Sequence, residues 1–148
     1  MLRSLMAYAR GAGIDARWVA VPGTPGFVRV TKRLHNMMHG EPGDGGGLGE
    51  AARAVYLGVN RRNAEGLAAG VRAGDVVVLH DPQTAAMVHA LKRRGAVVVW
   101  RSHIGTERPN ELVDAAWQFL LPHARAADAR VFSRYAYVPP ACGRCPRR

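Results

Sequence analysis

DVVVLHDPQTAAMVHALKRRGAVVVWRSH, residues 75–103, is the stretch that decides the fold of this chain. Its two ends, 75–79 (DVVVL) and 96–100 (AVVVW), are runs of β-branched residues without polar alternation, which is typical of strands buried on both faces of a parallel sheet. Between them, residues 84–94 predict a helix that ends in basic side chains, favourable at the negative end of the helix dipole, and is closed by Gly95. A strand, a helix and a strand in this order predict a right-handed parallel crossover.

Hydrophobic spacing predicts further elements on both sides of this unit. Apolar residues at intervals of three and four predict helices, and short apolar runs bounded by glycine or proline predict strands. The predicted helices are 1–10, 27–38, 50–67 and 110–123, and the further strands are 16–21 (ARWVAV) and 129–132 (ARVF). The glycine-rich residues 40–49 predict a mobile loop. We therefore expect an α/β domain with four strands in a parallel sheet and flanking helices.

The composition fits one globular domain, with 148 residues of which 48% are hydrophobic and 22% charged. The uncharged apolar runs are much shorter than the roughly 20 residues that cross a bilayer, so a membrane is not expected as a partner. Residues 1–10 lack the continuous apolar core of a secretory signal, and we expect a cytoplasmic protein. Cys142 and Cys145 lie together near the C-terminus, so no disulfide is expected within the main body.

The net charge of +10 suits a protein that binds nucleic acid or polyphosphate. It also has a plainer explanation. Of the 21 basic residues only Lys32 and Lys92 are lysines, and such an arginine excess is typical of a GC-rich genome. The arginines are scattered and do not alternate with aromatic residues, as a stacking platform for bases requires. We therefore do not expect nucleic acid as a partner.

Polar residues follow the two central strands at the point where each strand ends. They are His80, Asp81 and Gln83 after the first strand, and Arg101 and His103 after the second. Because ligands of open α/β sheets bind beyond the carboxyl ends of the strands, these side chains are candidates for one site. Arg101 could neutralise a phosphate or bind sugar hydroxyls through paired hydrogen bonds.

Ordinary structural roles are open for the same residues. Asp81 followed by Pro82 suits the start of a helix, with Asp81 as the capping residue. His80 could hydrogen-bond a neighbouring loop and do nothing more. A zinc site formed by His80, Asp81 and His103 is conceivable, but their spacing matches no known metal pattern, so we expect neither a metal nor another cofactor.

Six motifs, in order and at similar spacing, resemble a known family. They are WVAVPGTPGF at 18–27, VTKRLHN at 30–36, YLGVNRRNAE at 56–65, VVVLHDPQTAA at 76–86, WRSHIGT at 100–106 and FLLPHARAADARVFS at 119–133. Over residues 1–140 the chain is similar to the N-terminal half of the glycosyltransferring trehalose synthases, which belong to family 4 of the glycosyltransferases. The resemblance implies a Rossmann-like parallel sheet that forms one half of a two-domain, GT-B type enzyme. It also implies a retaining transferase that moves glucose from a nucleoside-diphosphate glucose to glucose, forming α,α-trehalose without a metal ion.

The resemblance further implies roles for individual residues. His103 matches the histidine that faces the transferred sugar, and Arg101 supports the same cleft, so these two are the expected catalytic residues. The expected substrate-binding residues are His80, Asp81 and Gln83, together with Lys32, His35 and Asn36 on the helix after the PGTPGF loop. A solvated helix face would explain the last three residues equally well.

Three features differ from the family pattern. The family has a strand and a Gly-Gly turn ahead of residues 1–10, an acidic residue where this chain has Gly105, and a donor-binding domain after residue 140. We therefore expect a chain that is shortened at both ends, inactive alone, and completed by a donor domain, possibly on a separate chain. The tail 141–148 (ACGRCPRR) does not resemble the family, and its CxxC pair lacks the further ligands of a zinc site.

Two alternatives remain open. The chain could be a non-catalytic module that binds a sugar phosphate, a nucleotide or nucleic acid through its basic surface. It could also be a gene remnant that no longer forms a functional protein.

Overall fold

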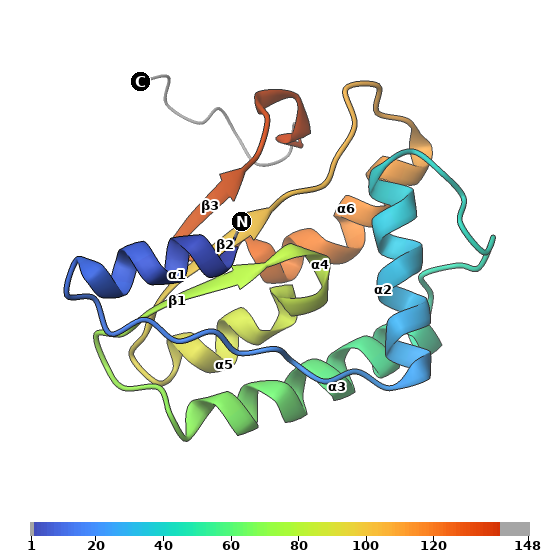
Figure 1. The fold of residues 1–148 in the computed structure, drawn as a ribbon. Coiled ribbons are helices and arrows are strands. Elements are labelled where there is room, and N and C mark those ends of the chain that lie inside the picture. The colour runs from blue at the N-terminus through green and yellow to red at the C-terminus, as the bar shows by residue number, and fades with distance from the viewer. Residues whose placement is uncertain (1, 140–148) are drawn as a thin grey trace.

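Within residues 2–139 the sheet consists of three parallel strands, which lie in the order β1-β2-β3. The computed structural model describes residues 2–139, and its strands are β1 (Val76–His80), β2 (Val97–Ser102) and β3 (Ala129–Phe132). The helices are α1 (Leu2–Gly11), α2 (Pro25–Met38), α3 (Glu50–Ala68), α4 (Asp81–Thr84), α5 (Val88–Lys92) and α6 (Glu111–Ala124), with 3-10 turns η1 (Ala85–Met87) and η2 (Tyr135–Tyr137). Helices connect β1 to β2 and β2 to β3, as Figure 1 shows. The predicted α/β fold with a Rossmann-like parallel sheet is thus confirmed.

Two helices begin directly after a residue whose side chain caps the first turn. The Thr24 hydroxyl accepts a hydrogen bond from the Phe27 amide at 3.2 Å and Pro25 opens the first turn, so α2 starts two residues earlier than predicted. The Asn110 side chain caps α6 in the same way, because its Oδ1 accepts hydrogen bonds from the Leu112 and Val113 amides. The predicted helix 84–94 is divided into α4, η1 and α5 and begins already at Asp81. Gly95 follows with a φ of +81°, as a residue that ends a helix requires.

The core lies between one face of the sheet and the helices α2, α3, α5 and α6 (Figure 1). Alternate side chains of β2, Val98, Trp100 and Ser102, point to this face and are fully buried. Tyr56 from α3 and Leu34 from α2 are fully buried against them in the same cluster. This packing holds the carboxyl ends of the strands in place.

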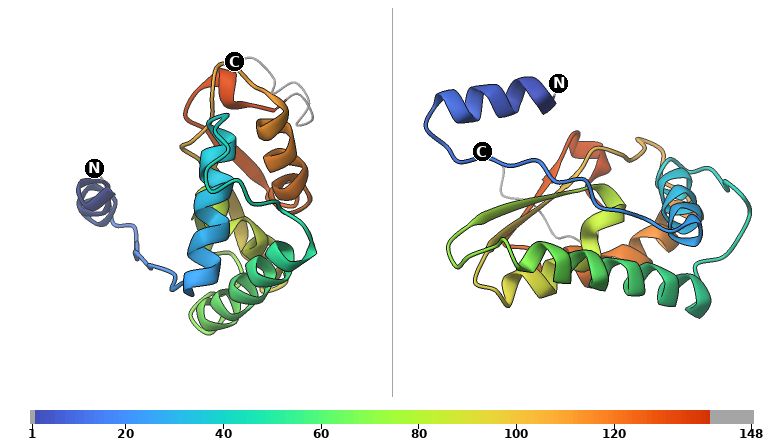
Figure 2. Two further views of the ribbon diagram at one scale, coloured as in Figure 1. Left: turned by 90° about the vertical axis from the view of Figure 1, so that its right-hand side faces the viewer. Right: turned by 60° about the horizontal axis from the view of Figure 1, so that its bottom comes forward.

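The other face of the sheet is open, which corrects the prediction that the strands are buried on both faces. Val76 is 65% exposed, Val78 48% and Val131 43%, although all three lie on strands of the sheet. Both views of Figure 2 show α1 standing apart from the rest of the molecule. Because the helices that pack on the sheet gather on its opposite face, these valines keep their contact with solvent.

The predicted strand 16–21 is wrong. Residues 14–24 form neither helix nor strand, and they make no ladder with any strand in the described part of the chain. Trp18 is 53% exposed and Val19 58%. The residue pattern was that of a strand, yet an extended run becomes one only where a neighbouring edge takes its backbone hydrogen bonds. In the described part of the chain the sheet therefore has three strands rather than the predicted four.

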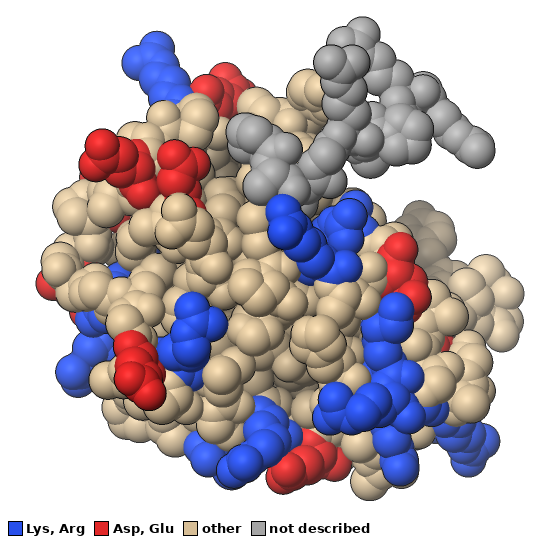
Figure 3. All heavy atoms as spheres, turned by 180° about the vertical axis from the view of Figure 1, so that it is seen from behind, with Lys and Arg blue, Asp and Glu red and all other residues tan. Residues whose placement is uncertain are grey.

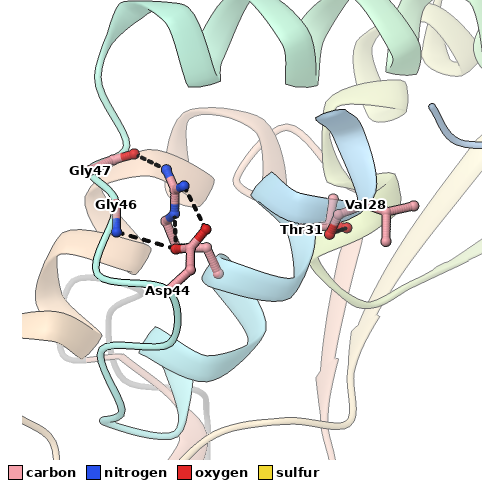
Figure 4. Close-up of polar contacts among 6 residues, drawn as sticks. Val28, Thr31, Asp44, Gly46 and Gly47 are labelled. Carbon is pink, nitrogen blue, oxygen red and sulfur yellow. Dashed lines mark hydrogen bonds and ion pairs between the residues drawn. The ribbon is translucent and has the colours of Figure 1, made fainter. Parts of the chain in front are cut away.

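The glycine-rich loop 40–49 is present as predicted, and its middle is fastened to α2. The Arg33 guanidinium donates to both carboxylate oxygens of Asp44, at 2.6 and 2.8 Å, and also to the Gly47 carbonyl. Figure 4 shows how Asp44 also accepts from the Gly46 amide. The hydrogen bond from Arg33 lowers the pKa of Asp44 to about 2. The mobility predicted for this loop stays a prediction.

No helix among residues 2–139 is both long enough and apolar enough to cross a bilayer. The predictions for residues 141–148, including the pair Cys142 and Cys145, fall outside the described residues.

Candidate functional site

Two histidines meet at the carboxyl edge of the sheet. His80 is the last residue of β1, and His103 directly follows β2. Nδ1 of His80 lies 3.0 Å from Nε2 of His103, and the two rings stack with their centroids 5.3 Å apart. Because a hydrogen bond holds one proton, only one of these two nitrogens can carry it. Burial lowers the pKa of His80, and the neighbouring His103 lowers it further, which favours the neutral imidazole of His80.

Asp81 fixes the position of His103 rather than the start of a helix. Its Oδ1 accepts a hydrogen bond from the His103 backbone amide at 2.7 Å, while its carbonyl accepts from Nε1 of Trp100 at 3.0 Å. Its φ is +62°, in the left-handed region that aspartate tolerates better than most residues. The prediction that Asp81 caps the helix is therefore wrong, because His80 occupies the cap position and the sharp turn directs the carboxylate across to the next loop.

Arg101 shares a face of the sheet with His80. The two residues are partners in the register of β1 and β2, and the preceding residues, Leu79 and Trp100, are buried on the opposite face. His80 and Arg101 thus lie side by side at the end of the open face. Nε of Arg101 is buried and, within the described residues, has no hydrogen-bond partner. A buried guanidinium nitrogen without an acceptor suits the binding of an anion or a hydroxyl.

The three candidate residues on α2 lie in different surroundings. Burial lowers the pKa of His35, with a further contribution from His39, whereas the charge of Asp81 raises it, so His35 lies within electrostatic range of the site. The Asn36 side chain packs against Gly43 of the loop 40–49, where a Cβ would come within 2.8 Å of its Nδ2. Lys32 is exposed.

Gln83 is half-buried on α4, two residues after Asp81. The structure therefore brings together His80, Asp81, Arg101 and His103. His35 lies near this group, and Asn36 lies against the loop 40–49.

Two aromatic residues near the site have no role in the sequence prediction. The hydroxyl of Tyr56, fully buried on α3, donates to the Pro82 carbonyl and so anchors the turn after β1. The Trp18 ring lies beside His80, with the ring centroids 6.1 Å apart. Both residues belong to motifs that resemble the family. Neither follows the carboxyl end of a strand, which is where ligands of open α/β sheets are expected to bind.

Gly105 has a structural reason to be glycine. A Cβ at this position would overlap the ring of Tyr137 from η2. The acidic residue that the resemblance places here would therefore require Tyr137 to move.

Within the described part of the chain, no group of three or more His, Cys, Asp or Glu side chains is arranged to hold a metal ion.

An open groove of about 440 Å³ lies between α3 and the segment formed by η1 and α5, where Arg61, His89 and Arg93 stand among alanines and glycine. This groove lies apart from the histidine pair. The basic side chains visible in Figure 3 occupy several separate places rather than one stripe.

Comparison with known proteins identifies relatives. The chain is 35% identical over 144 residues to a trehalose synthase of Rubrobacter xylanophilus, which covers 95% of this chain and 33% of that protein. It is 34% identical to a trehalose synthase of Pyrococcus horikoshii, over 95% of this chain and 32% of that protein. A trehalose phosphorylase of Pleurotus sajor-caju is 29% identical over 79% of this chain and 16% of its own length. The chain thus spans about a third of the length of the trehalose synthases that it matches.

A solved structure supports the same relationship. The crystal structure of α,α-trehalose 6-phosphate synthase from Burkholderia multivorans superposes with a TM-score of 0.54 at 25% identity, covering 76% of this chain and 26% of that one. The family model described as the N-terminal domain of trehalose synthase matches residues 1–139. The resemblance seen in the motifs is confirmed, and the chain belongs to the family of trehalose synthase N-terminal domains.

Proposed function

We propose that this chain is the acceptor-side domain of a retaining glycosyltransferase that moves glucose from a nucleoside-diphosphate glucose to glucose and forms trehalose. The observation that carries the proposal is the group of His80, His103 and Arg101 at the carboxyl edge of the sheet, in a chain of this family. Ligands of open α/β sheets bind at this edge. In this proposal a second domain binds the donor sugar nucleotide.

The geometry supports a division of work among the residues. Within the described residues, the pair shares one hydrogen bond between Nδ1 of His80 and Nε2 of His103, which leaves the second nitrogen of each ring for sugar hydroxyls. Asp81 holds the loop that carries His103 through its bond to the backbone amide. Arg101 supplies a fixed positive charge, and such a charge stabilises the phosphate as its bond to the sugar breaks.

The remaining candidates take supporting roles in this proposal. His35 and Gln83 would extend the acceptor site beyond the histidine pair, since His35 lies in electrostatic range of Asp81 and Gln83 follows Asp81 on α4. Lys32, on the exposed face of α2, would contact the acceptor only at the rim. Asn36 would act indirectly, through the loop 40–49 that it contacts.

Reconstitution tests the proposal. The purified chain is mixed with a separately produced donor domain of a related trehalose synthase, nucleoside-diphosphate glucose and glucose, and trehalose is measured by chromatography. We expect trehalose in the mixture and none when His103→Ala replaces the native chain. Gln118→Ala, on the exposed side of α6, is the matched control and should leave the yield unchanged. Equal yields from His103→Ala and the native chain would show that the site is assigned wrongly.

A second candidate function is the binding of an anionic ligand without catalysis. The groove between α3 and α5 favours it, because Arg61 and Arg93 flank a floor of small side chains. Binding of inorganic pyrophosphate that weakens with salt and is lost in Arg93→Ala, together with no binding of glucose, would support this function over the first.

A further inference from the structure

The exposed tryptophan beside the histidine pair has no structural task that explains its position. The chain has three tryptophans, of which Trp100 and Trp117 are buried in the core while Trp18 is 53% exposed. Exposing an indole to water is unfavourable, and a large exposed aromatic beside polar groups is a common feature of binding sites. Trp18 stands on the segment 14–24, which pairs with none of the three described strands.

The rings of Trp18, His80 and His103 follow one another along the carboxyl edge of the sheet. The centroid of Trp18 lies 6.1 Å from that of His80, with the ring planes inclined by 43°, and the centroid of His80 lies 5.3 Å from that of His103. Arg101 adjoins His80 in the register of the sheet. An aromatic face and hydrogen-bonding nitrogens therefore border the same place from different elements.

This combination matches the two kinds of surface on a pyranose. The C–H groups on one face of a glucose ring form an apolar patch that stacks on an indole, while the hydroxyls project around the edge of the ring. A site for such a ligand needs an aromatic platform and a few fixed polar groups beside it. Tryptophan suits the platform because it combines a large flat surface with few rotatable bonds.

We propose that Trp18 is the stacking platform for the acceptor glucose, and that the hydroxyl groups of this glucose point to His80 and Arg101. The inference rests on the proposed function and extends it by naming the residue that sets the position of the acceptor ring. It makes Trp18 a binding residue that acts by contact with the sugar.

Fluorescence provides a test on the native chain, because Trp18 is the one exposed tryptophan of the three. Acrylamide quenches exposed indoles far more than buried ones, so quenching of the native chain reports on Trp18. We expect D-glucose to lower the quenching constant about twofold. In Trp18→Phe the quenchable part of the emission should disappear, which verifies the assignment of the signal.

Calorimetry with D-glucose separates stacking from a general structural effect. We expect Trp18→Ala to weaken glucose binding about five- to tenfold, in line with the loss of one aromatic contact, and Trp18→Phe to stay within about twofold. Val19→Ala, a truncation at the equally exposed neighbour, should bind as the native chain does. Unchanged quenching with glucose, or equal glucose affinity of Trp18→Ala and the native chain, would overturn the inference.

The reconstituted trehalose assay distinguishes this inference from the proposed function. Protection of Trp18 by glucose without any trehalose in the mixture would support the inference and reject the proposed transfer reaction. Trehalose formation with the same KM for glucose in Trp18→Ala would support the transfer reaction and reject the platform.

Discussion

Substitutions at Asp81 test the turn on which the candidate site depends. The residue combines a left-handed backbone, with a φ of +62°, and a carboxylate that accepts from the His103 amide at 2.7 Å. Asp81→Ala removes the hydrogen bond and keeps a Cβ in the strained conformation. Asp81→Gly removes the same bond but relieves the strain, and Asp81→Asn keeps an acceptor oxygen in a residue that also tolerates this conformation.

The structure sets the order of stability. Loss of a hydrogen bond to a charged acceptor costs about 1.5–3 kcal/mol, so Asp81→Ala should lower the free energy of unfolding by at least that amount. Relative to alanine, glycine at position 81 relieves the left-handed strain, which stabilises the folded state by about 1–2 kcal/mol. Glycine also gives the unfolded chain more conformational freedom, which lowers the free energy of unfolding by about 0.5–1 kcal/mol. The glycine variant should thus be up to about 1.5 kcal/mol more stable than the alanine variant, and Asp81→Asn the most stable of the three.

Urea denaturation followed by far-ultraviolet circular dichroism measures these differences, with Asp114→Ala on the exposed side of α6 as a control outside the site. A glycine variant less stable than the alanine variant would refute the left-handed conformation at residue 81. An asparagine variant as unstable as the alanine variant would refute the contribution of the bond to His103.

Three further predictions concern the same framework. Tyr56→Phe should destabilise the chain by about 1–3 kcal/mol in urea, because the buried Pro82 carbonyl loses its donor, and an unchanged midpoint would contradict the anchoring role. The pKa of Asp44 lies at about 2, below its usual 3.8. The ion pair of Asp44 with Arg33 should therefore hold the loop 40–49 in place above pH 3.8 and release it as the pH falls toward 2. Limited proteolysis with an acid-active protease should show this release in the native chain and not in Asp44→Asn. The pKa of His80 lies below its usual 6.5, so the unfolded chain takes up the proton more readily and stability should decline as the pH falls below 6.5. Urea midpoints on both sides of that pH should show a smaller decline in His80→Gln, with His35 and His123, whose pKa values are also lowered, accounting for the remainder.

The elements that hydrophobic pattern alone could predict are those whose partners lie nearby in sequence. The strands β1 and β2 and the helix region between them were identifiable because each run of β-branched residues is bounded by a turn signal such as Gly95. The segment 16–21 also has the local pattern of a strand, yet among the described residues it pairs with no other strand. Pairing depends on a neighbouring edge, which a local pattern does not contain.

The candidate site was predictable in its location and less so in its internal contacts. The rule that ligands bind beyond the carboxyl ends of strands selected His80, Asp81, Arg101 and His103, and the structure brings these four together. The rule could not foresee that Asp81 adopts a positive φ and turns away from the helix that it was expected to cap. Nor could it select Trp18, which reaches the site from a segment distant in sequence.

The alternation of side chains along the strands explains why the site and the exposed valines occupy the same face. Leu79 and Trp100 point into the core, so their neighbours His80 and Arg101 must point to the open face, in line with Val78 and Val97. A shift of one residue in the register of either strand would bury the histidine or the arginine and expose a large apolar side chain, and the burial of Trp100 opposes such a shift. The packing of the core on one face thus determines which side chains are available for chemistry on the other.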